Sequence, residues 1–243
     1  VWVVTGDGDG LSIGGNHFMH VLRRNMDVNI LMFNNRIYGL TKGQYSPTSE
    51  QGKKTKASPY GSIDYPLNPP SLALGAQATF VARTIDRWQK HMAAMLERSY
   101  NHDGGSFIEI YQNCNIFNDA AFEEYTGAEK FSNVIELKHG EPMVFAQGTK
   151  GIKLDGFKPK VVDMEKNSID DILIHNETDL DLAHIIANWT SHPTLPEPIG
   201  VIYCIDKTTY NQDIVNQIES AIEAKGPGNV QDLLNSGDTW VVA

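Results

Sequence analysis

Short apolar runs alternate with amphipathic segments through the first half of the chain. Residues 1–5 (VWVVT) and 28–33 (VNILMF) are continuous apolar runs of the length expected for buried parallel strands. Between them, residues 15–25 carry apolar side chains at helical spacing and two arginines near the end, where positive charge suits the helix dipole. Strand, helix and strand in this order predict a βαβ unit with parallel strands and a right-handed crossover.

The same alternation continues to residue 111. The pattern predicts a helix at 71–77, a strand at 78–82, an amphipathic helix at 85–100 and a strand at 106–111. A long loop at 36–70, rich in Gly, Pro, Ser, Thr and Lys, precedes them, and loops of this length in compact domains are usually functional or mobile. These elements together predict an α/β fold with a doubly wound, mostly parallel sheet.

The pattern changes after residue 122. We divide the chain there into an α/β domain, residues 1–122, and a C-terminal extension, residues 123–243, that packs on it. Because Val1 already lies inside a predicted strand, we expect the N-terminal part of the first domain to precede it. The elements predicted in the extension are short strands within 134–162, a helix at 179–190, a strand at 195–205, and a helix at 212–225 with Asn211 as its cap and Gly226 as its stop.

The composition is typical of a globular protein and argues against several other classes. The 243 residues are 41% hydrophobic and 21% charged, which suits a globular chain with a sizeable core. The net charge of −10 argues against a nucleic-acid-binding surface. No apolar run reaches the length of a membrane span, and we expect neither a signal peptide nor a membrane partner. The two cysteines argue against a disulfide framework and favour the reducing cytoplasm.

The stretch GDGDGLSIGG at 6–15 follows the first predicted strand and has three interpretations. A calcium-binding EF-hand loop is excluded, because its fifth position is Leu11 and its twelfth, which needs a bidentate glutamate, is Phe18. A dinucleotide-binding GxGxxG is excluded as well, because the third glycine would fall on Leu11 or Ile13.

The third interpretation is a metal–diphosphate site shared by two strand ends. Asp7 follows the first strand, Asn34 and Asn35 follow the second, and parallel strands bring their carboxyl ends to the same edge of the sheet. A carboxylate, an amide oxygen and a backbone carbonyl form an oxygen-only half-shell that phosphate oxygens and water complete to the octahedron Mg²⁺ requires. Each residue alone is typical of a turn, but together at this spacing they favour the metal. Glycines allow backbone amides to approach the phosphates, and those available are Gly6, Gly8 and Gly39.

GDG at 6–8 with NN at 34–35 resembles the signature of thiamine diphosphate enzymes. A longer segment of the sequence resembles the β subunit of 2-oxoacid:ferredoxin oxidoreductases, particularly the 2-oxoglutarate type. This segment is GDGDGLSIGGNHFMHVLRRNMDVNILMFNNRIYGLTKGQYSPTS. The resemblance continues through NPPSLALGAQATFVAR, QNCNIFND, PEPIGVI and LLNSGDTW, and so covers essentially the whole chain.

The resemblance implies a role for particular residues. It makes Asp7, Asn35 and the main-chain oxygen of Ile37 the ligands of Mg²⁺. It places Lys42, with its neighbour Thr41, at the catalytic position, where a lysine would meet the distal carboxylate of the substrate. The remaining implied contacts are with thiamine diphosphate, and they come from Gly6, Gly8, Asp9, Gly39 and Leu40.

Cys114 is the remaining implied ligand. On its own, a cysteine at the end of a strand is usually a small buried hydrophobic residue. The resemblance makes it one of four ligands of a [4Fe–4S] cluster, and the other three cysteines are expected upstream of Val1. Cys204 lies within a predicted strand and is interpreted as structural.

The function implied is oxidative decarboxylation of a 2-oxoacid, expected to be 2-oxoglutarate, with CoA to give acyl-CoA, CO₂ and reduced ferredoxin. The expected partner is the α subunit, because the glutamate that activates thiamine in this superfamily comes from a partner module. The assembly would therefore be a heterodimer with its active site at the interface. Two alternatives remain: a non-redox thiamine diphosphate enzyme of the acetolactate synthase or decarboxylase type, and an inactive structural subunit.

Overall fold

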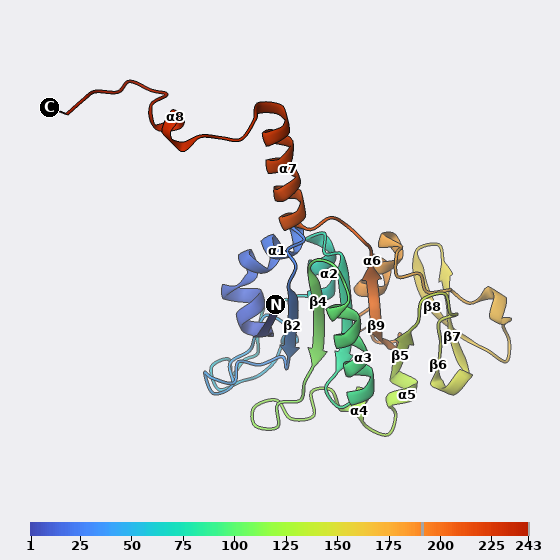
Figure 1. Cartoon of the computed structure of the whole chain (residues 1–243). Coiled ribbons are helices and arrows are strands. Elements are labelled where there is room, and N and C mark those ends of the chain that lie inside the picture. Colours follow the sequence, from blue (N-terminus) through green and yellow to red (C-terminus); the bar gives the residue numbers. More distant parts are fainter. Residues whose placement is uncertain (191, 243) are drawn as a thin grey trace.

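The computed structural model describes residues 1–190 and 192–242 of the chain (Figure 1). Its centre is a six-stranded sheet, and a second sheet of three short antiparallel strands lies beside it. The three-stranded sheet consists of β6 (Val144–Phe145), β7 (Lys150–Asp155) and β8 (Lys158–Asp163). The strands of the main sheet, in spatial order, are β1 (Trp2–Gly6), β2 (Asn29–Asn34), β4 (Ser106–Tyr111), β3 (Phe80–Ile85), β9 (Glu197–Cys204) and β5 (Val134–Leu137).

The first four strands of the main sheet are parallel to one another. The last residues of β2 and β3, Asn34 and Ile85, both pair with Tyr111 of β4, so these strands end in one row. Strand β9 pairs antiparallel with β3, and β5 is parallel to β9. The predicted βαβ unit and the mostly parallel sheet are therefore confirmed, and the carboxyl ends of β1, β2 and β4 meet at one edge.

Helices cover both faces of the main sheet. One hydrophobic cluster joins α1, α2 and α6 to one face, and another joins α3 to the opposite face. Two short 3₁₀ segments, η2 (Ala146–Gly148) and η3 (Ile169–Asp171), lie among the connections of the second half. The α-helices are α1 (Gly15–Arg23), α2 (Pro69–Gly75), α3 (Gln89–Tyr100), α4 (Glu123–Thr126), α5 (Lys130–Asn133), α6 (Leu180–Asn188), α7 (Tyr210–Lys225) and α8 (Val230–Leu234).

Three predicted helix starts were wrong, and the first of these helices, α2, begins at Pro69 rather than at 71. Helix α3 begins at Gln89 rather than at 85, because residues up to Ile85 remain in the sheet through their pairing with β4. Helix α7 begins at Tyr210, and its cap is Thr209 rather than Asn211, since Thr209 Oγ1 accepts a hydrogen bond from the Gln212 amide at 3.2 Å. The starts of α3 and α7 are both set by contacts of residues just outside the segment with helical periodicity.

The second half of the chain contributes to both sheets. Strands β5 and β9 extend the main sheet across residue 122, so the proposed division at that residue runs through a continuous sheet. Helix α7 and the following segment extend away from the body of the molecule (Figure 1). Within the described residues, no helix combines the length and apolar character needed to cross a membrane.

Candidate functional site

The carboxyl ends of β1 and β2 open into a pocket of about 430 Å³. The pocket brings together residues of the glycine-rich turn after β1 and of the loop after β2, as the sequence predicted for a parallel pair. It includes all the predicted metal ligands except Cys114, all the predicted cofactor contacts, and Thr41. The lining residues are Gly6, Asp7, Gly8, Asp9, Ser12, Ile13, Asn35, Ile37, Tyr38, Gly39, Leu40, Thr41 and Gln44.

Asp7 is the most buried carboxylate of the pocket, with 2% of its surface exposed. Burial raises the pKa of the Asp7 carboxyl, because it penalises the charged form. Hydrogen bonds from the Ser46 and Thr48 side chains and from the Asn35 backbone lower that pKa, but the net shift is upward. A cation in the pocket would favour the ionised form and offset the desolvation.

The loop after β2 turns sharply enough to aim its backbone at the same pocket. Arg36 has φ of 56°, in the left-handed region that non-glycine residues rarely adopt. Two asparagine side chains hold this turn: Asn34 Oδ1 accepts from the Arg36 amide at 3.2 Å, and Asn35 Oδ1 accepts from the Ile37 amide at 3.3 Å. The Ile37 side chain is buried, so it anchors the backbone that follows.

The donor set of the pocket fits Mg²⁺ bound to a diphosphate. Asp7, Asn35 and the Ile37 carbonyl supply oxygen atoms of the hard type that Mg²⁺ prefers. Within residues 1–190 and 192–242, no cluster of three or more His, Cys, Asp or Glu side chains is arranged to hold a metal ion. The three oxygen ligands of the pocket form a partial shell, which suits a metal that also binds the phosphates of a cofactor.

Gly8 fits its place only because it lacks a side chain. A Cβ atom at this position would overlap the ring of Tyr38, whose hydroxyl donates to the Gly8 carbonyl at 3.3 Å. At Gly6, two residues earlier on the same turn, an added Cβ would meet nothing within 4 Å. The close approach of Tyr38 to the turn therefore requires glycine at residue 8.

We expect Gly8→Ala to lower the free energy of unfolding by about 1–3 kcal/mol, the usual cost of overpacking a filled site. Gly6→Ala is the matched control and should cost less, because it enters open space. Chemical denaturation of both variants measures the difference. Equal losses would show that the Tyr38 ring moves aside freely and does not constrain residue 8.

Lys42 and Cys114 lie outside the lining of the pocket. Lys42 is exposed and has φ of 64°, on the same loop as the neighbouring Thr41. Cys114 is a half-buried free thiol in the turn after β4. That turn is joined to the metal-binding loop, because Asn118, which bridges to Cys114, donates its side-chain amide to the Asn35 carbonyl at 2.8 Å.

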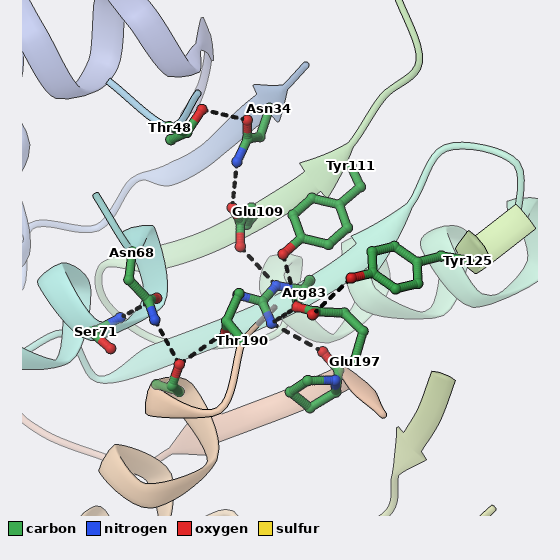
Figure 2. A network of polar contacts seen from close by, with 12 residues as sticks. Asn34, Thr48, Asn68, Ser71, Arg83, Glu109, Tyr111, Tyr125, Thr190 and Glu197 are labelled. Carbon is green, nitrogen blue, oxygen red and sulfur yellow. Dashed lines mark hydrogen bonds and ion pairs between the residues drawn. The ribbon is translucent and has the colours of Figure 1, made fainter. Parts of the chain in front are cut away.

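A buried hydrogen-bond network runs from Asp7 into the sheet. The sequence did not predict it. Thr48 Oγ1 lies 2.7 Å from Asp7 Oδ2 and 2.8 Å from Asn34 Oδ1. The Asn34 amide donates to Glu109 Oε1 at 2.7 Å (Figure 2). The Arg83 guanidinium in turn contacts the other oxygen of Glu109, also at 2.7 Å.

The far side of the network holds a second carboxylate. Arg83 Nη1 lies 2.6 Å from Glu197 Oε1, and the Tyr111 hydroxyl donates to the same oxygen at 2.8 Å (Figure 2). Arg83 and Glu109 are paired directly across β3 and β4 in the sheet register. A single charge within each apolar run, ATFVARTI and SFIEIY, was the sequence signal for this buried pair.

Comparisons with known proteins identify the family. Residues 1–110 match the family model described as "Thiamine pyrophosphate enzyme, C-terminal TPP binding domain". The entire chain aligns with 2-oxoglutarate oxidoreductase subunit KorB of Mycobacterium tuberculosis, at 46% identity over 247 residues. The chain belongs to the β-subunit family of 2-oxoacid oxidoreductases. The resemblance noted in the sequence is thereby confirmed.

Other members of this family are similar over shorter stretches. The β subunit of 2-oxoacid:ferredoxin oxidoreductase 1 of Aeropyrum pernix is 43% identical over 120 residues, 49% of this chain. The chain spans 66% of the mycobacterial relative and 38% of the Aeropyrum relative.

A solved structure supports the fold of this family. It is 2-oxoglutarate:ferredoxin oxidoreductase from Magnetococcus marinus, with 2-oxoglutarate, coenzyme A and succinyl-CoA bound. The likeness has a TM-score of 0.72 at 25% identity and covers 98% of this chain and 68% of that one. The predicted α/β architecture therefore agrees with a related enzyme of known structure.

Proposed function

We propose that this chain is the β subunit of a 2-oxoglutarate:ferredoxin oxidoreductase and binds Mg²⁺–thiamine diphosphate. The reaction would convert 2-oxoglutarate and CoA to succinyl-CoA and CO₂ and reduce ferredoxin. One observation carries the proposal: the pocket at the ends of β1 and β2 gathers an aspartate, an asparagine and a backbone turn beside glycines. The names of the M. tuberculosis and Magnetococcus relatives support the choice of substrate.

Asp7, Asn35 and the Ile37 carbonyl would hold Mg²⁺ in this proposal. The backbone around Gly6, Gly8 and Gly39 would approach the diphosphate, and Asp9 and Leu40 line the same pocket. Bound thiamine diphosphate would supply the electron sink for decarboxylation, while the chain binds the diphosphate, orients the cofactor and shields the charges.

Partner groups complete the proposed site. Among the described residues, Asp7 and Asp9 supply the only carboxylates that line the pocket, so the glutamate that activates the cofactor would come from an α subunit. A heterodimer with its active site at the interface follows from this arrangement. A cytoplasmic setting is part of the proposal, because both cysteines are free thiols.

Cys114 would supply one thiolate to a [4Fe–4S] cluster. Its turn is tied to the Asn35 loop through Asn118, which would place the cluster near the cofactor. Cys204 pairs with Phe80 at the opposite end of β3, so it lies at the other edge of the sheet. The remaining three thiolates would come from elsewhere in the assembled enzyme.

Lys42 would recognise the distal carboxylate of the substrate. We expect Lys42→Ala, in the assembled enzyme, to lower kcat/KM for 2-oxoglutarate by about ten- to hundredfold, the effect of one charge-assisted hydrogen bond. Pyruvate lacks this carboxylate and should change by only a few-fold. The measurement is CoA-dependent viologen reduction with each substrate.

Lys56→Ala is the control, because Lys56 is another exposed lysine of the same loop. It should leave both kcat/KM values unchanged. Equal losses for the two substrates in Lys42→Ala would assign carboxylate recognition to another residue. Failure of the wild-type enzyme to reduce viologen with any 2-oxoacid would contradict the proposed function itself.

A further inference from the structure

Thr48 lies between the two strand ends that form the pocket. Its hydroxyl oxygen is within hydrogen-bond distance of both Asp7 Oδ2, at 2.7 Å, and Asn34 Oδ1, at 2.8 Å. The Thr48 side chain is 4% exposed, and both neighbours are buried to 2% exposure. A hydroxyl carries one proton, so it can donate to only one of these oxygens at a time.

The orientation of Asn34 decides where that proton goes. The Asn34 amide nitrogen lies 2.7 Å from Glu109 Oε1, and an ion-paired carboxylate accepts hydrogen bonds only. The Asn34 carbonyl oxygen must therefore point towards Thr48. That oxygen already accepts from the Arg36 amide at 3.2 Å.

The Asp7 carboxylate is the stronger acceptor of the two. Hydrogen bonds to an ionised oxygen are shorter and stronger than those to a neutral carbonyl. Since the Asn34 carbonyl has the Arg36 amide as a donor, the Thr48 proton is available to Asp7. Together with the Ser46 side chain and the Asn35 backbone, which also hydrogen-bond to Asp7, the hydroxyl then fixes the rotation of the carboxylate that lines the pocket.

The loop that carries Thr48 is itself held in place. The Ser49 hydroxyl accepts from the Ser46 amide at 2.8 Å and donates to the Arg36 carbonyl at 2.6 Å. At Pro47, the carbonyl accepts from the Leu67 amide at 2.8 Å. The Thr48 hydroxyl is therefore held in place by contacts of its own loop.

We infer that Thr48 is a positioning residue for the metal site, holding the Asp7 carboxylate in the orientation that binds the divalent cation. This inference rests on the proposed function. The chain of contacts behind it runs from Arg83 on β3 through Glu109 on β4 and Asn34 on β2 to Thr48 and Asp7. Residues of β2, β3 and β4 thus help to fix the Asp7 carboxylate, which follows β1.

The test measures thiamine diphosphate binding to the assembled enzyme by calorimetry at increasing concentrations of Mg²⁺. We expect Thr48→Val, which keeps the shape but removes the hydroxyl, to weaken Mg²⁺ binding by about ten- to hundredfold. Thr48→Ser keeps the hydroxyl and should restore binding to within a few-fold of wild type. This readout needs no turnover of substrate.

Thr84→Val is the matched control. Thr84 is a fully buried threonine of β3 whose hydroxyl bonds to His91 Nδ1 at 2.8 Å, so the variant also loses one buried hydroxyl contact. It should leave Mg²⁺ affinity unchanged. Thermal unfolding of both valine variants separates a loss of stability from a loss of metal affinity.

The outcomes separate the role of Thr48 from the proposed function. If wild type requires Mg²⁺ and Thr48→Val binds it as tightly as wild type, the positioning role is wrong while the proposed function stands. If Thr48→Ser fails as badly as Thr48→Val, the hydroxyl is not the determinant, and the role is again wrong. If wild type takes up the cofactor without a divalent cation, both the metal site and the role of Thr48 fail.

Discussion

We expect Asp7→Asn to lower the affinity of Mg²⁺-dependent thiamine diphosphate binding by at least about a hundredfold. Asp7 supplies the full negative charge among the three proposed protein ligands, whereas Asn35 and the Ile37 carbonyl are neutral. Breaking a buried contact to a charged partner costs several kcal/mol, and about 2.7 kcal/mol is a hundredfold in binding. Calorimetry on the assembled enzyme, with and without Mg²⁺, measures the loss.

The stability of Asp7→Asn distinguishes a ligand from a structural residue. Burial raises the pKa of Asp7 in the folded state, so the folded chain binds the proton more tightly than the unfolded chain. The carboxylate therefore lowers stability as pH rises through that raised pKa. Without metal at neutral pH, we expect Asp7→Asn to be at least as stable as wild type. A variant that unfolds easily and also loses the cofactor would assign Asp7 a structural role instead.

We expect Arg83→Met to destabilise the fold by about 3–5 kcal/mol, the usual result of removing one partner from a buried ion pair. The guanidinium is fully buried and lies between two carboxylates, at 2.7 Å from Glu109 and 2.6 Å from Glu197. Its loss leaves both acids in the interior of the sheet without that counter-charge. This is a large part of the 5–15 kcal/mol that stabilises a typical domain.

Arg98→Met is the control for this prediction. Arg98 pairs with Glu177 at 2.8 Å, but its side chain is 44% exposed, so the pair should contribute no more than about 1 kcal/mol. Denaturant unfolding compares the two variants. Similar losses for both would show that the buried network is not a main source of stability.

The part of the site that the sequence predicted depends on residues next to each other in the chain. Asp7 and Asn35 each follow an apolar strand directly, and a parallel βαβ unit fixes where such strand ends meet. Nothing comparable marks Thr48, because the loop at 36–70 has no periodicity and its path depends on contacts with β1 and β2. The sequence could therefore name the loop as functional without naming the residue.

The sequence also does not show which strands pair when they lie far apart in the chain. Arg83 and Glu109 each stand out as a charge in an apolar strand, but their contact depends on the register of β3 with β4. The antiparallel position of β9 beside β3 likewise has no local signal, since about a hundred residues separate the two strands. Periodicity identifies such elements but does not say which neighbour each one takes.

The most direct test of the metal site is a crystal structure of the assembled enzyme with thiamine diphosphate and Mn²⁺ in place of Mg²⁺. The anomalous signal of Mn²⁺ marks the ion independently of the surrounding atoms. We predict one peak in the pocket at the ends of β1 and β2, coordinated by Asp7, the Asn35 side-chain oxygen and the Ile37 carbonyl. A peak coordinated by other residues, or cofactor bound in this pocket with no metal beside Asp7, would contradict it.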